Sequence, residues 1–107
     1  MDIGKLAELI VTDCKMSLTV ASQEFNQPIA GEAVLHYKYY LAYLRGEKSA
    51  EGMLPVINET VQMPHKLLKA VFGEVSSVVL PTDEEAVRAL EQAKPELEIL
   101  FTQYGAR

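Results

Sequence analysis

The segment TDEEAVRALEQAKPELEILFTQY, residues 82–104, carries the clearest structural signal in the chain. Thr82 and Glu85 have the spacing of a capping box, in which each side chain accepts a hydrogen bond from the other residue's backbone amide. Beyond them, apolar residues recur at steps of three and four: Ala86, Leu90, Ala93, Leu97, Leu100 and Tyr104. This spacing gathers apolar side chains on one side of a helix, where they pack against other helices. The segment therefore predicts a long, capped C-terminal helix.

Pro95 lies in the middle of this segment, and the apolar spacing continues through it without a change of register. A proline inside a helix removes one backbone hydrogen bond and bends the helix. We expect one long helix kinked at Pro95, with two helices meeting there as the alternative. Gly105 is the expected end of the helix.

The first segment of the chain also has helical spacing. Apolar residues follow steps of three and four from Ile3 to Phe25, which predicts a long first helix ending by Pro28. The alternative is a break near Asp13, because residues 16–20 alternate apolar and polar side chains as a strand does. The length and continuity of the pattern favour the helix.

Residues 32–45 contain neither glycine nor proline and predict a second helix. Gly46 suits the left-handed residue that often follows a helix. Ser49 is placed to accept hydrogen bonds from the first amides of a third helix, which should stop or kink at Met63 because the next residue is Pro64.

The segment after Met63 completes the predicted fold. Helical spacing from His65 to Phe72 predicts a fourth helix, whereas residues 74–80 are β-branched and are interpreted as a connector or one short strand. The chain is thus expected to be a single all-α domain, residues 1–107, folded as a small irregular bundle of four or five helices.

Composition limits the classes of function. The chain has 107 residues, of which 49% are hydrophobic and 23% charged, with a formal net charge of −5. This acidic balance argues against nucleic-acid binding, which depends on Lys and Arg neutralising phosphates. No signal peptide or membrane-spanning stretch is evident, so we expect a soluble, cytoplasmic protein without a membrane partner.

Cys14 is the only cysteine. A disulfide within the chain and a cysteine-based zinc site are therefore excluded. Cys14 lies on the apolar side of the first predicted helix, where it is expected to be a small buried hydrophobic residue.

One stripe on the second predicted helix could carry chemistry. Glu32, His36 and Tyr40 lie four residues apart, so a carboxylate, an imidazole and a phenol share one side of the helix. Glu32 and His36 could bind a metal, or Glu32 could orient His36 as a general base while Tyr40 donates a proton. A metal would need a third ligand such as His65, and nothing marks that residue as one. We therefore expect no metal and no cofactor, and keep a small enzyme or metal-binding protein as the alternative function.

The same helix holds four tyrosines within seven residues, which cannot all point inward. Tyrosine is enriched at protein interfaces because its ring is apolar and its hydroxyl can remain solvated. The leading hypothesis is a non-enzymatic, self-associating interaction module (an adaptor, chaperone-like subunit or inhibitor) whose partner is another protein or a second copy. The candidate interaction surface consists of Tyr37, Tyr39, Tyr40, Tyr43, Leu97, Leu100, Phe101 and Tyr104.

A third hypothesis is a DNA-binding regulator with a helix-turn-helix in residues 49–73, joined at Met63 and Pro64. The junction lacks the glycine typical of this motif. The candidate recognition helix offers only His65, Lys66 and Lys69 to the DNA, so this hypothesis ranks last.

Overall fold

The all-α prediction is confirmed in a computed structural model that describes residues 2–23, 31–62 and 80–103. Four α-helices and one short 3-10 helix account for most of these residues. They are α1 (Ile3–Gln23), α2 (Gly31–Leu44), the 3-10 helix η1 (Glu51–Met53), α3 (Leu54–Gln62) and α5 (Asp83–Gln103).

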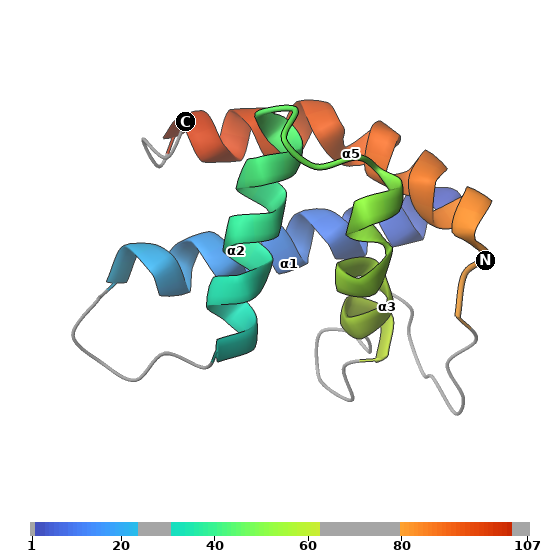
Figure 1. The fold of residues 1–107 in the computed structure, drawn as a ribbon, viewed down its shortest axis with the longest axis horizontal. Helices are drawn as coiled ribbons and strands as arrows, with labels where there is room; N and C mark the ends of the chain where they lie inside the picture. The colour runs from blue at the N-terminus through green and yellow to red at the C-terminus, as the bar shows by residue number, and fades with distance from the viewer. Residues whose placement is uncertain (1, 24–30, 63–79, 104–107) are drawn as a thin grey trace.

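The two longest helices, α1 and α5, lie side by side and run in the same direction (Figure 1). The shorter helices α2 and α3 run in opposite directions and cross the long pair (Figure 1). Both α2 and α3 contact α1 and α5. This crossing brings side chains from α1, α2 and α3 to one place in the interior, where the candidate site lies.

Helix α1 is continuous through Asp13 and through residues 16–20, so the strand alternative for that stretch is wrong. The polar residues that suggested a strand donate hydrogen bonds within the helix. The hydroxyls of Ser17 and Thr19 bond to the carbonyl oxygens four residues earlier, at 2.9 and 2.8 Å. A hydroxyl paired in this way is compatible with a helix interior, and the buried Leu18 anchors the segment to the core.

The predicted end of α2 is observed, whereas the predicted start of the third helix is the 3-10 helix η1 and α3 begins at Leu54. Gly46 has a φ of +77°, and the amide of Glu47 donates to the carbonyl of Ala42 at 2.8 Å, which closes the end of α2. Ser49 accepts a hydrogen bond from the amide of Gly52 at 3.1 Å. Helix α3 is described as far as Gln62. The prediction for residues 64–72, and that for residues 74–80 except Leu80, lie outside the described residues.

Helix α5 begins with the predicted capping box. The Thr82 amide donates to Glu85 Oε1 at 2.8 Å, and the Glu85 amide donates to Thr82 Oγ1 at 3.2 Å. The helix passes through Pro95 as one element of 21 residues, so the alternative of two helices is wrong. Pro95 and Glu91, whose carbonyl loses its amide partner, are both exposed, and water can therefore hydrate that carbonyl.

One hydrophobic core joins all of the helices. Its largest fully buried side chains include Leu6, Leu9, Ile10, Leu18, Tyr40, Met53, Ile57, Leu90, Leu97 and Phe101. Cys14 is fully buried among them, as predicted, and its burial raises the pKa of the thiol. Among the described helices, none combines the length and the hydropathy needed to cross a membrane.

Candidate functional site

His36 lies at the centre of a polar cluster inside the protein. Only 5% of this residue is exposed, and it projects from α2 between two carboxylates. Its Nδ1 lies 3.0 Å from Asp13 Oδ2 on α1, and its Nε2 lies 2.9 Å from Glu59 Oε2 on α3. The imidazole therefore joins three helices. We call Asp13, His36, Tyr40, Glu59 and Thr60 the His36 cluster.

The geometry favours a doubly protonated His36 ring. An ionised carboxylate only accepts hydrogen bonds, so a ring nitrogen that faces one carries the proton. The raised pKa of His36 also favours the imidazolium. Burial lowers the pKa of His36, but the hydrogen bonds and negative charges of Asp13 and Glu59 outweigh it and raise the pKa from 6.5 to about 9.

Asp13 is the main acceptor of the cluster. Besides the His36 ring, Oδ2 accepts hydrogen bonds from the Tyr40 hydroxyl at 2.6 Å and the Thr60 hydroxyl at 2.9 Å. The Thr60 oxygen also lies 2.8 Å from the Val56 carbonyl, so its single proton is shared between two acceptors. Burial and the charge of Asp13 raise the pKa of Tyr40, which keeps this phenol a donor. Among the described residues, every buried side-chain nitrogen and oxygen has a hydrogen-bond partner.

The His36 cluster links three helices and is not arranged to chelate a metal ion. Asp13 and Glu59 lie against opposite ring nitrogens of His36, so their carboxylates cannot converge on one ion beside a single nitrogen. In the part of the chain that the structure describes, no group of three His, Cys, Asp or Glu side chains is placed to hold a metal. The Glu32 side chain and all of His65 lie outside the described atoms.

The structure brings together His36 and Tyr40, as the predicted stripe requires, but it does so through Asp13. Sequence analysis missed Asp13, Glu59 and Thr60 as members of this cluster. A signal for Asp13 was present, because Ile10, Asp13 and Ser17 follow helical steps on the side of α1 that is buried. A carboxylate in such a position requires buried partners.

The tyrosines of α2 have different surroundings. Tyr40 and Tyr43 are buried, whereas Tyr37 and Tyr39 are partly exposed. The Tyr37 ring stacks on Phe101 with 5.8 Å between ring centres, and the Lys48 ammonium lies 4.3 Å from the centre of the Tyr39 ring.

Of the C-terminal residues in the predicted surface, Leu97 and Phe101 are fully buried, Leu100 is half-buried and Tyr104 lies outside the described residues. Four of the eight residues of the predicted interaction surface, Tyr40, Tyr43, Leu97 and Phe101, therefore lie in the core of this chain.

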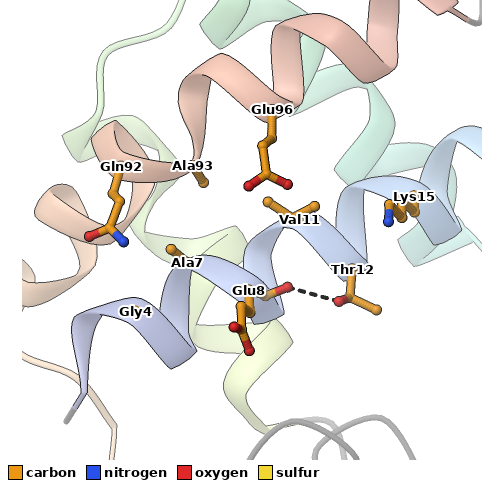
Figure 2. A pocket seen from close by; sticks show the side chains of 9 residues that line it. All are labelled: Gly4, Ala7, Glu8, Val11, Thr12, Lys15, Gln92, Ala93 and Glu96. Carbon is orange, nitrogen blue, oxygen red and sulfur yellow. Dashed lines mark hydrogen bonds between the residues drawn. The ribbon is translucent and has the colours of Figure 1, made fainter.

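A groove of about 460 Å³ lies between α1 and α5 (Figure 2). Ala7, Val11 and Ala93 are buried and form its floor, and the remaining lining residues are Gly4, Glu8, Thr12, Lys15, Gln92 and Glu96. Figure 2 shows Gly4 to Lys15 along α1, with Gln92, Ala93 and Glu96 facing them from α5. We call this hollow the α1/α5 groove. It does not include His36.

Comparison with known proteins adds no functional information. No family model matches the chain, and neither a curated protein nor a solved structure matches it at a significant level. The function must therefore be inferred from the His36 cluster and from the described surface.

Proposed function

We propose that this chain is a non-enzymatic helical interaction module that associates with a second copy of itself. The observation that carries the proposal is the use of His36. Both nitrogens of its ring bond to carboxylates of the same chain, and the side chain is buried. His36, the side chain best suited to acid–base catalysis near neutral pH, is thus used to hold α1, α2 and α3 together.

The enzyme alternative receives less support from this geometry. A general base needs a free lone pair within hydrogen-bond reach of a substrate proton. An imidazolium between two carboxylates has no free lone pair. The neighbouring Tyr40 hydroxyl is also committed to Asp13 at 2.6 Å. Either group would have to leave its partner before it could act on a substrate.

The outer side of α2 supports the interaction role. Leu35 is 42% exposed, and Tyr39 lies one turn later on the same side of the helix with part of its ring exposed. Partly solvated tyrosines and exposed leucines are the side chains that a protein contact buries with little desolvation cost. These two residues are the part of the predicted contact on α2 that the variants below test.

We expect the double variant Leu35→Ala/Tyr39→Ala to be a monomer. The wild-type protein should have a mass above that of one 11.9 kDa chain in light scattering after size-exclusion chromatography. Leu35 is exposed and Tyr39 packs only partly against the core, so the variant should remain folded with a helical circular-dichroism signal close to that of the wild type.

Leu80→Ala is the matched control, because Leu80 is exposed to a similar degree but precedes α5. This variant should retain the wild-type mass. A wild-type protein that stays monomeric at high concentration would refute self-association. A double variant with the mass of the wild type would show that α2 is not the contact surface.

A further inference from the structure

We propose that the α1/α5 groove of one copy accepts the outer side of α2 from a second copy, which joins the chains head to tail. This inference rests on the self-association proposed above and assigns the second surface of the contact. The occupant is identified by shape and by charge complementarity.

The groove has a lining that could accept a helix. It runs between two parallel helices, and the small side chains of Ala7 and Ala93 form its floor together with Val11 (Figure 2). A floor of small side chains lets the backbone of a third helix approach closely, as when the ridge of one helix packs into the groove of another. Glu8 and Glu96 contribute carboxylates from opposite sides of the groove, and Lys15 is the only base among the described residues that line it.

The outer side of α2 has complementary features. Leu35, Lys38, Ala42 and Arg45 follow one another at steps of three, four and three, so they form one ridge along the helix. Leu35, Lys38 and Arg45 are exposed, and Ala42 is partly exposed. We call these four residues the α2 ridge. It presents two bases beside a leucine and an alanine.

The pairing satisfies both charge and hydrophobicity. Lys38 and Arg45 would meet the carboxylates of Glu8 and Glu96. Ile99, which is 57% exposed, follows Glu96 by three residues on α5 and offers an apolar contact to Leu35. Exposed ion pairs add little affinity but select orientation and reject mismatched surfaces, so the charges would set which faces meet.

The two surfaces belong to different elements, α2 on one side and the α1/α5 pair on the other. A contact between unlike surfaces is heterologous and leaves one free groove and one free ridge at the ends of each assembly. It therefore generates rings or chains. A twofold contact between two α2 helices would instead stop at a dimer.

Charge reversal tests this inference with two single variants. Lys38→Glu alters the ridge and keeps the groove, whereas Glu96→Lys alters the groove and keeps the ridge. Each variant alone should have the mass of one chain in light scattering. An equimolar mixture should regain a mass above that of one chain, because the intact ridge of Glu96→Lys can meet the intact groove of Lys38→Glu. The two altered surfaces carry opposite charges in the mixture and can also meet.

The double variant Lys38→Glu/Glu96→Lys is the matched control, since it restores opposite charges and should recover at least part of the wild-type mass. Circular dichroism checks that each variant is folded. If a reversal lowers helicity, the reversal at the other charged residue of the same surface replaces it, Arg45→Glu for the ridge or Glu8→Lys for the groove, with the same expected loss of mass.

The outcomes separate this inference from the proposed function. A monomeric wild type would overturn both. A self-associating wild type whose folded variants keep the wild-type mass would overturn the groove assignment alone. Monomeric single variants whose mixture stays monomeric would overturn the head-to-tail contact, because that contact requires the two variants to associate.

Discussion

Asp13→Ala is expected to lower the free energy of unfolding by about 3–5 kcal/mol, the cost of removing one partner from a buried ion pair. The substitution leaves the buried His36 charge without its buried acceptor. It also deprives the Tyr40 and Thr60 hydroxyls of the Asp13 oxygen to which both donate. A domain of this size is stable by about 5–15 kcal/mol, so the loss is a large share of the total.

Urea unfolding followed by circular dichroism measures this effect. Two controls locate it within the His36 cluster. Asp13→Asn keeps the shape and one acceptor oxygen, so it should cost less than Asp13→Ala. Glu59→Gln alters the outer end of the cluster, where the side chain is 55% exposed, and should cost at most about 1 kcal/mol. A stability of Asp13→Ala within about 1 kcal/mol of the wild type would contradict the role assigned to this carboxylate.

The second large effect is a loss of stability as pH rises from 6.5 to 9. His36 has a higher pKa in the folded protein, about 9, than the 6.5 of an ordinary histidine. The folded state therefore binds this proton more tightly than the unfolded state does. The resulting stabilisation is complete below pH 6.5 and is lost as pH rises through 9. The expected change is about 2 kcal/mol, reduced from the full linkage value because solvent screens the exposed Glu59.

Urea unfolding at several pH values between 6.5 and 9 measures this loss. His36→Gln is the control, because it removes the titrating group and should flatten the profile. An ordinary thiol has a pKa of 9.0, so Cys14 begins to ionise in the unfolded chain at the upper end of this range. It does so in both proteins, and the difference between the two profiles therefore reports His36. A wild-type profile as flat as that of His36→Gln would contradict the expected linkage.

Local sequence patterns were sufficient to predict the α-helices that the structure describes. The capping box at Thr82 and Glu85 and the glycine after α2 are determined by residues a few positions apart, and the structure shows them as predicted. The continuity of α5 through Pro95 follows from its unbroken apolar seam. The uncertainty at residues 16–20 arose because hydroxyl side chains are typical of strands, although a helix can pair them with its own carbonyls.

The candidate site could be predicted only in part. His36 and Tyr40 share one helix, so their spacing placed them together. Asp13 and Glu59 each lie 23 residues from His36, on opposite sides of it in sequence, and meet it only because α1 and α3 pack against α2. Spacing within one helix cannot reveal partners on two others. For the same reason it could not show which tyrosines of α2 the other helices cover.

A titration of His36 by nuclear magnetic resonance tests the central claim most directly, namely that this side chain is an internal imidazolium between two carboxylates. The chain has two histidines, and the spectrum of His36→Gln identifies the signal of His36. We predict a pKa of about 9, with both ring nitrogens protonated at neutral pH. A pKa at or below 6.5, or a neutral ring with one unprotonated nitrogen at neutral pH, would contradict the account and return His36 to consideration as a general base.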